Sequence, residues 1–170
     1  MNHCLYCYEP ILSDKDGPEL KHVDFHEGCA KKIFYKKKAP IINIKQSQLL
    51  ELAEKVIQSQ ISVTGAQPKI SLGIAKSKNL PDKLTIVGLW GEYILKPQAE
   101  NYPFLPENEH LTMRLAYQSG IKTVINSLVK LQSGELAYIT RRMDRIKKAK
   151  LHLEDMCQLT ERLTEDKYKG

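Results

Sequence analysis

The sequence has no long apolar run and no recognisable secretion signal. None of its stretches approaches the roughly 18 consecutive apolar residues that a transmembrane helix requires. The opening residues, MNHCLYCYEPIL, lack the basic segment and the apolar core of a signal peptide. We therefore expect a globular cytoplasmic protein that has no membrane partner.

Aromatic residues are also scarce, at 7% of the 170 residues. Basic residues gather at Lys36–Lys38 and between Arg141 and Lys150, without an interleaved aromatic platform of the kind that stacks on single-stranded nucleic acid. The net charge of +6, from 26 basic and 20 acidic residues, permits an anionic partner such as a nucleotide. Because a well-solvated surface has the same charge balance, composition alone does not identify a partner.

Hydrophobic periodicity predicts a mixed order of helices and strands. Residues 47–59 place their apolar side chains on one helical face, with Ser47 as the N-cap. Residues 106–120 also indicate a helix, because Pro106 suits a first turn and Gly120 suits the position after a last turn. Runs rich in β-branched and aromatic residues predict strands at 69–76, 83–90 and 92–97, a hairpin from 123–131 and 135–143, and the start of another helix near 153.

This order predicts an α+β fold, mainly an antiparallel sheet with one or two packed helices. The regular strand–helix alternation of a doubly wound parallel sheet is missing from the pattern. We expect a small Cys/His module with its connector at residues 1–38, loop-like to about Phe34. The sheet and its helices are expected at residues 39–170.

Three of the four cysteines and one histidine form two closely spaced pairs near the N-terminus. Two residues separate Cys4 from Cys7, and two separate His26 from Cys29. Such pairs can place four donors around a tetrahedral Zn²⁺, which would stabilise a short segment with little core of its own. Reduced, unligated thiols are the alternative in a cytoplasmic protein, and His22 is an alternative ligand to His26. Because four ligands leave no open position, the predicted zinc is structural rather than catalytic.

The stretch SVTGAQPK, residues 62–69, separates a helical run from a strand-like run. It matches neither the GxxxxGK[ST] motif nor the GxGxxG motif, and its pattern alone is typical of an ordinary turn. Gly65 would let backbone amides turn inward, the hydroxyl groups of Ser62 and Thr64 can donate, and Lys69 supplies charge. The stretch is therefore either a plain turn or a phosphate-binding loop.

Two later residues fit the phosphate interpretation. Lys96 ends the strand-like run EYILKP, and Glu109 lies early in the following helix. A strand lysine held by a helix glutamate, with the lysine on nucleotide phosphates, is the arrangement of protein kinases. The alternative is a surface lysine and an acidic residue that favours the start of a helix.

Five ordered segments resemble HipA-like serine/threonine kinases, the toxins of bacterial toxin–antitoxin pairs. The segments are SVTGAQPKISL, EYILKP, ENEHLTMRLA, LAYITRRMDR and LEDMCQLT. They occur in the order seen in that family, and the resemblance covers roughly Ser47 to Gly170. It implies the fold of a kinase N-terminal lobe, and the N-terminal cysteine segment resembles one carried by some members of the group.

The resemblance implies roles for individual positions in binding ATP with Mg²⁺. Ser62 matches a regulatory serine that becomes phosphorylated, Lys96 matches the ATP-binding lysine, and Glu109 matches the helix glutamate. Residues 141–143 match the hinge that takes the adenine mainly through backbone groups. The implied nucleotide-binding residues are Val63, Thr64, Gly65, Ala66, Gln67, Lys69, Lys96, Glu109, Arg141, Arg142 and Met143.

The sequence departs from the family pattern in two respects. Arg141 stands where the family commonly has an acidic hinge residue. The 170 residues contain no D-x-H-x-x-N-like catalytic loop and no recognisable metal-binding aspartate after it. Because phosphoryl transfer requires groups that hold Mg²⁺ and orient the nucleophile, we expect this chain to be catalytically incomplete by itself.

The resemblance also implies partners. These are a helix-turn-helix antitoxin, a kinase C-terminal lobe, or both, together with a protein substrate for the full-length family; nucleic acid would be contacted only through the antitoxin. Two other functions remain open. One is a non-catalytic interaction module that pairs with a kinase C-terminal lobe or an antitoxin. The other is a zinc-ribbon nucleic-acid-binding protein, based on the Cys/His pairs and Lys36–Lys38.

Overall fold

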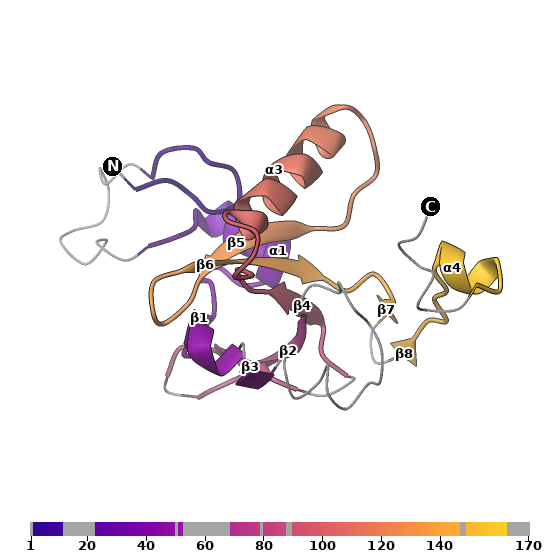
Figure 1. The fold of residues 1–170 in the computed structure, drawn as a ribbon. Coiled ribbons are helices and arrows are strands. Elements are labelled where there is room, and N and C mark those ends of the chain that lie inside the picture. The colour runs from indigo at the N-terminus through magenta and orange to yellow at the C-terminus, as the bar shows by residue number, and fades with distance from the viewer. Residues whose placement is uncertain are drawn as a thin grey trace.

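The computed structural model describes residues 2–11, 23–49, 51–52, 69–78, 80–87, 90–146 and 149–162. Figure 1 shows that a curved sheet lies at the centre of these residues, with a long helix above it. The strands of this sheet are β1 (Ile41–Ile42), β2 (Ile70–Ala75), β3 (Lys83–Ile86), β4 (Tyr93–Lys96), β5 (Asn126–Lys130) and β6 (Leu136–Arg141).

The six strands are arranged in the order β1-β3-β2-β4-β6-β5. Every neighbouring pair is antiparallel except β1 with β3. The sheet therefore confirms the predicted α+β class, and each of its longer strands lies within a predicted strand-like run. The run at 83–90 continues as a strand only to Ile86, and the run at 123–131 becomes a strand only at Asn126.

Alternation along the central strands gives the sheet two different faces. On β4, Tyr93 and Leu95 are fully buried, whereas the residues between and after them are partly buried. Tyr93 packs against Phe34 with 5.9 Å between the ring centroids, and both belong to the main hydrophobic core. The opposite face, to which Lys96 points, is covered by the long helix.

That helix is α3 (Leu105–Gln118), and it packs against β5 and β6. Pro106 lies in its first turn, as predicted. Its end forms a Schellman motif, in which Gly120 N–H donates to Tyr117 O and Ile121 N–H donates to Ala116 O, both over 3.0 Å. Gly120 has a φ of +83°, which explains why glycine stands directly after the helix.

The predicted hairpin joins β5 to β6 through residues 131–135. Leu131 N–H donates to Glu135 O over 2.9 Å, and Gly134 N–H donates to Leu131 O over 3.0 Å. Gly134 has a φ of +102°, a backbone conformation that favours glycine. The turn is therefore closed by local hydrogen bonds around the predicted glycine.

The N-terminal segment differs from its predicted loop-like character, because it contains helix α1 (Glu27–Phe34). Ala30, Ile33 and Phe34 form its buried face, while Glu27 lies at its positive end. The chain before α1 lies along β5: Leu128 N–H donates to Leu5 O over 3.2 Å and so covers this edge of the sheet. The predicted boundary at residue 38 stays a prediction, although side chains from both sides of it share one core.

A second helical segment begins at residue 46 rather than after Ser47. Lys45 N–H donates a hydrogen bond to Gln48 Oε1 over 3.0 Å, and Leu49 N–H donates to Lys45 O. Ser47 is therefore inside the helix, and the predicted N-cap is wrong because the helix begins at residue 46, one position before Ser47. Residues 46–49 and 51–52 are helical; the rest of the predicted helix at 47–59 lies outside the described residues.

The described C-terminal part contains β7 (Arg145–Ile146), β8 (Ala149–Lys150) and the short helix α4 (Met156–Leu159). Asp155 caps α4 in a reciprocal capping box with Gln158. The predicted helix near 153 thus begins three residues later. Among the described residues, no helix has the length and apolar character needed to cross a membrane.

Candidate functional site

A lysine and a glutamate from different elements meet on the α3 face of the sheet. Lys96 is the last residue of β4, and Glu109 lies in the second turn of α3. Lys96 Nζ donates a hydrogen bond to Glu109 Oε1 over 2.5 Å. The two side chains are 26% and 24% exposed, so the ion pair lies at the boundary between protein and solvent. The structure therefore brings together the two residues that the sequence singled out.

The ring of Tyr138 lies beside this ion pair. Tyr138 is opposite Lys96 in the register of β4 and β6, and Lys96 Nζ lies 5.5 Å from its ring centroid. Burial raises the pKa of Tyr138, and the negative charge of Glu109 raises it further. The phenol therefore stays neutral, and its ring face is available to the ammonium group as a cation–π partner.

The predicted phosphate loop cannot be compared with the structure, except at its end. Ser62, Val63, Thr64, Gly65, Ala66 and Gln67 lie outside the described residues. Lys69 is described, is exposed and directly precedes β2. Because Ile70 of β2 pairs with Leu95 of β4, continuing this antiparallel register by one residue puts Lys69 opposite Lys96. The end of the predicted loop thus approaches the lysine at the end of β4.

The predicted hinge follows β6 at the other end of β4. Arg141 pairs with Tyr93, three register positions from the pair that contains Lys96, which is about 10 Å along the strand. Arg141 N–H donates to Ile125 O and Arg142 N–H donates to Glu92 O. Met143 is 66% exposed.

The guanidinium group of Arg141 turns toward a ring rather than toward the hinge backbone. Arg141 Cζ lies 4.3 Å from the ring centroid of Tyr35, which follows α1. An arginine at this position therefore has a structural partner in the N-terminal module.

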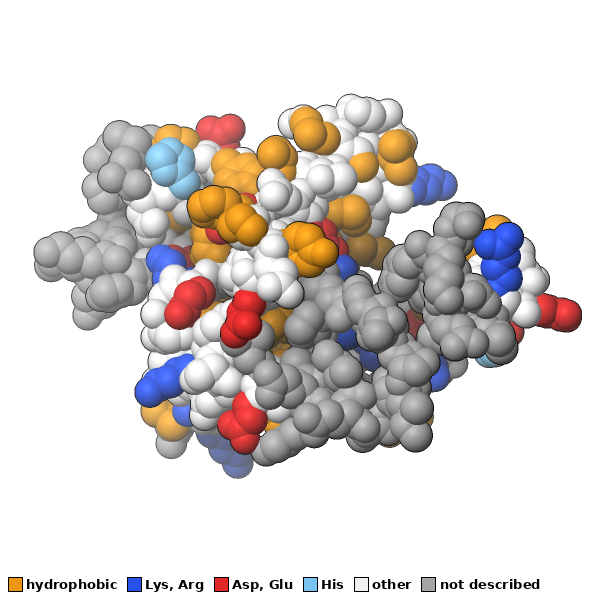
Figure 2. Space-filling view, in the orientation of Figure 1, with side chains coloured by type: hydrophobic (Ala, Val, Ile, Leu, Met, Phe, Trp, Pro, Cys, Tyr) orange, Lys and Arg blue, Asp and Glu red, His pale blue; other side chains and the backbone are white. Residues whose placement is uncertain are grey.

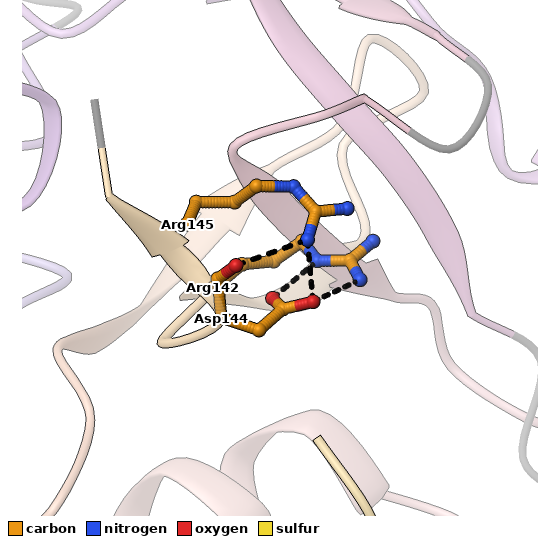
Figure 3. Close-up of polar contacts among 3 residues, drawn as sticks. All are labelled: Arg142, Asp144 and Arg145. Carbon is orange, nitrogen blue, oxygen red and sulfur yellow. Dashed lines mark hydrogen bonds and ion pairs between the residues drawn. The ribbon is translucent and has the colours of Figure 1, made fainter. Parts of the chain in front are cut away.

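A buried carboxylate, which the sequence did not single out, organises the turn after β6. Figure 3 shows the side chains of Arg142 and Arg145 both directed toward the carboxylate of Asp144. Arg142 donates to both carboxylate oxygens, Nε to Oδ1 over 2.9 Å and Nη2 to Oδ2 over 2.8 Å. Arg145 Nη1 also donates to Oδ2. The hydrogen bond from Arg142 is the main cause that lowers the pKa of Asp144 to about 2, although burial opposes the shift. The alternating charges of RRMDR were the only sequence signal for this cluster.

The two Cys/His pairs come together into one cluster. One ligand atom from each of Cys4, Cys7, His26 and Cys29 lies within 4.8 Å of all the others. Zinc–sulfur bonds of about 2.3 Å in a tetrahedron would separate the sulfur atoms by about 3.8 Å. The donor set and its size therefore fit a metal ion of this kind. His22, the alternative ligand, lies outside the described residues.

The hydrogen bonds of His26 leave the correct ring nitrogen for a metal. His26 Nε2 lies 3.2 Å from Pro10 O. Because a carbonyl oxygen only accepts, Nε2 carries the proton, and Nδ1 keeps its lone pair. Nδ1 faces the thiols, 3.5 Å from Cys7 Sγ and 3.9 Å from Cys29 Sγ. A second hydrogen bond that fixes the histidine tautomer is typical of metal ligands.

The protein environment also separates the acidities of the thiols. Burial opposes ionisation of Cys4, but backbone hydrogen bonds from Cys7, His26 and Tyr6 outweigh it and lower its pKa to about 7. Burial and the negative charge of Cys4 raise the pKa of Cys29 to about 12. Backbone amides thus already point at a thiolate position in this cluster.

Comparison with known proteins identifies the family. Residues 61–170 match the HipA-like C-terminal domain family, and because this is more than half of the chain, the chain belongs to that family. A protein from Haemophilus influenzae (strain ATCC 51907 / DSM 11121 / KW20 / Rd), named "Putative kinase", is 39% identical over 104 residues. The aligned part is 58% of this chain but 29% of that relative. The predicted resemblance to HipA-like proteins is confirmed; the position of this chain as an N-terminal lobe stays a prediction.

Replacing Asp144 by Asn should destabilise the fold, because Arg142 and Arg145 would lose their shared buried anion. We expect a loss of about 3 kcal/mol in the free energy of unfolding at neutral pH. The folded-state pKa of this carboxyl is lowered, so its contribution is complete above the unfolded-state value near 4 and is lost as pH falls toward about 2. Urea unfolding of parent and Asp144→Asn between pH 2 and 7 would measure both effects, with the difference shrinking at the acid end.

The matched control is Asp82→Asn, which removes the same charge from an ion pair with Lys36 at the surface. We expect a much smaller loss for this variant. Equal losses for the two variants, or a difference from the parent that does not change with pH, would contradict the role given to Asp144.

Proposed function

We propose that this chain carries the nucleotide-binding lobe of a HipA-like serine/threonine kinase. The observation that carries the proposal is the ion pair between Lys96 at the end of β4 and Glu109 of α3. Protein kinases use such a pair to hold the lysine that contacts the nucleotide phosphates. Membership of the HipA-like C-terminal domain family and the similarity to a "Putative kinase" support this use of the pair.

In this proposal the ion pair prepares a phosphate-binding ammonium group. Lys96 has three N–H donors. One of them is directed to Glu109, which leaves the others for phosphate oxygens. The partial exposure of the pair keeps Lys96 accessible, while Glu109 limits the conformations of its long side chain. Mg²⁺, when bound with ATP, would neutralise phosphate charge in such a site.

The remaining nucleotide contacts follow from the two ends of β4. Val63 to Gln67 and Lys69 are proposed to cover the phosphates, and the register of Lys69 with Lys96 supports this. Ser62 remains the proposed phosphorylation site of the loop. At the hinge, the backbone N–H groups of Arg141 and Arg142 already donate to Ile125 O and Glu92 O. Contact with adenine is therefore proposed mainly for the backbone of Met143.

The proposal is limited to nucleotide binding by these residues. Phosphoryl transfer needs groups that hold Mg²⁺ and orient the nucleophile, and the 170 residues contain no D-x-H-x-x-N-like motif. For the whole protein we propose the activity of a HipA-like toxin, which would phosphorylate a protein substrate and be regulated through Ser62.

Replacing Lys96 by Met should weaken the binding of MgATP, because methionine has an unbranched side chain of similar size but no ammonium group. Loss of a charge-assisted hydrogen bond predicts a dissociation constant raised about tenfold or more. Isothermal titration calorimetry at constant ionic strength would measure it. Glu109→Gln should give a smaller change in the same direction, because the lysine loses its anchor but keeps its charge.

Lys78→Met is the matched control, because this substitution changes the net charge by the same amount. Lys78 is exposed and lies in the connection between β2 and β3. It should bind MgATP as the parent does. The nucleotide proposal fails if Lys96→Met keeps the affinity of the parent, or if Lys78→Met loses as much as Lys96→Met.

We also propose a toxin–antitoxin role with a helix-turn-helix antitoxin as partner. Figure 2 shows hydrophobic side chains gathered on the face of the molecule over α3. Leu111 and Leu115, one turn apart on this helix, are 50% and 54% exposed. An exposed apolar face of this kind is typical of a protein–protein contact, and the family resemblance supplies the partner.

Co-expression with a helix-turn-helix protein encoded beside this chain should give a complex on size-exclusion chromatography. The double variant Leu111→Glu/Leu115→Glu should abolish it, because charges would be buried in the contact. Leu80→Glu, at a leucine that is 63% exposed between β2 and β3, is the control and should retain the complex. Elution of the two proteins as separate species would speak against this partner.

We further propose that Cys4, Cys7, His26 and Cys29 hold a structural Zn²⁺. The convergence of four donors and the protonation of His26 at Nε2 support this proposal. The ion would join the N-terminal turn to the start of α1, which carries buried Ile33 and Phe34 of the core. It would therefore stabilise the module and its contact with the sheet.

Cys4→Ser should remove the metal and lower the melting temperature. We expect one equivalent of zinc in the parent by elemental analysis and much less in the variant. A loss of about 2 kcal/mol would lower the melting temperature by about 5 °C for a chain of this size. Cys157→Ser changes the cysteine outside the cluster and should keep both the zinc and the melting temperature. Zinc that is equally retained in Cys4→Ser would rule out the proposed ligand set.

A further inference from the structure

A cavity lies where the N-terminal module meets helix α3 and the chain leading into β5. Its volume is about 230 Å³. None of the residues proposed for nucleotide or zinc binding lines it. The lining residues are Tyr6, Lys32, Met113, Arg114, Tyr117, Thr123, Val124, Ile125 and Asn126.

Two cations from different elements converge on one aromatic ring in this cavity. Lys32 Nζ of α1 lies 5.9 Å from the centroid of the Tyr6 ring, and Arg114 Cζ of α3 lies 5.7 Å from the same centroid. No carboxylate is among the lining residues. Within the described part of the chain, neither cation has an acidic partner in salt-bridge range, and the cavity therefore has a positive potential.

The other lysines around α1 differ in this respect. Lys31 and Lys37 both pair with Glu27, and Lys36 pairs with Asp82. The lysines near Lys32 in the sequence therefore have acidic partners. Lys32 instead lines the cavity. The positive charge at the cavity is for this reason a local feature and not a general property of α1.

Internal hydrogen bonds fix one wall of the cavity, while other lining residues carry polar groups that a ligand can contact. The amide of Asn126 is used internally: its Oδ1 lies 2.7 Å from His110 Nδ1, and its Nδ2 donates to Val124 O over 2.8 Å. Thr123 and Tyr117 add hydroxyl groups to the lining. Hydroxyl groups can donate to an anion, and the fixed amide keeps this wall in place.

We propose that this cavity binds the phosphate group of a phosphate monoester, held by Lys32 and Arg114. A dianion matches two cations that face one cavity without a carboxylate. Arg114 would contribute planar paired N–H donors and Lys32 a point charge, both as charge-assisted hydrogen bonds to phosphate oxygens. Tyr6 places the two cations at the site in the absence of ligand.

The location gives such a ligand a structural consequence. Lys32 and Tyr6 belong to the N-terminal module, whereas Arg114 lies on α3, the helix that also carries Glu109. A bound phosphate would therefore connect the module to α3. The phosphate comes either from a free small molecule or from a phosphorylated side chain, two sources with the same chemistry.

The test is an NMR titration of the ¹⁵N-labelled 170-residue chain with inorganic phosphate and, separately, with a short phosphoserine peptide blocked at both ends. Sodium chloride keeps the ionic strength constant in both series. We expect saturable shifts of the Arg114 Nε–Hε signal and of backbone amides between Thr123 and Asn126. Lys32→Gln and Arg114→Gln should each raise the dissociation constant about tenfold. Lys31→Gln, which removes the same charge one residue away, should leave it unchanged.

Similar affinity for both probes would identify a free phosphate or small monoester as the source, and tighter binding of the phosphoserine peptide would identify a phosphorylated side chain. The proposal is overturned if neither probe gives saturable shifts at these signals. It is also overturned if both cavity variants bind as the parent does, or if Lys31→Gln weakens binding equally. Lys32 is exposed, so Lys32→Gln gives a decisive result even if Arg114→Gln does not fold.

Discussion

The ion pair between Lys96 and Glu109 depends on the alternation of side chains along β4. Tyr93 and Leu95 enter the core on one face, so Lys96 must emerge on the other, where α3 lies. The antiparallel register then places Tyr138 beside Lys96 and brings Lys69 toward it. A one-residue slip of β4 would bury the lysine and expose core side chains. The site is thus tied to the same pattern that builds the sheet.

The N-terminal module is joined to this arrangement at several points. Leu5 O accepts hydrogen bonds from Leu128 N–H and Ser127 Oγ at the edge of β5. The Tyr8 ring packs against His110 of α3 with 5.2 Å between centroids. Burial lowers the pKa of His110, so this histidine stays neutral inside the contact. The module therefore supports α3. A metal in the Cys/His cluster would stabilise the module and, through this contact, the helix that carries Glu109.

Local sequence patterns predicted the structure well where it depends on interactions between residues close in the sequence. Pro106 and Gly120 predicted the ends of α3 because caps depend on neighbouring backbone groups, and Gly134 predicted the hairpin turn for the same reason. Helix α1 was missed because its eight residues include a glycine and a cysteine of the candidate metal set, and its burial is decided by the sheet beneath it. Ser47 was a plausible cap by residue type, but the helix begins before it, where Gln48 Oε1 accepts a hydrogen bond from Lys45 N–H.

The sequence by itself determined the family segments, the spacing of the Cys/His pairs and the strand and helix that carry Lys96 and Glu109, because these are encoded by short-range pattern. Only the tertiary structure decided which distant groups meet. The cavity of Lys32 and Arg114, for example, joins residues that are far apart in sequence. Such contacts arise from packing of whole elements, and no local period records them.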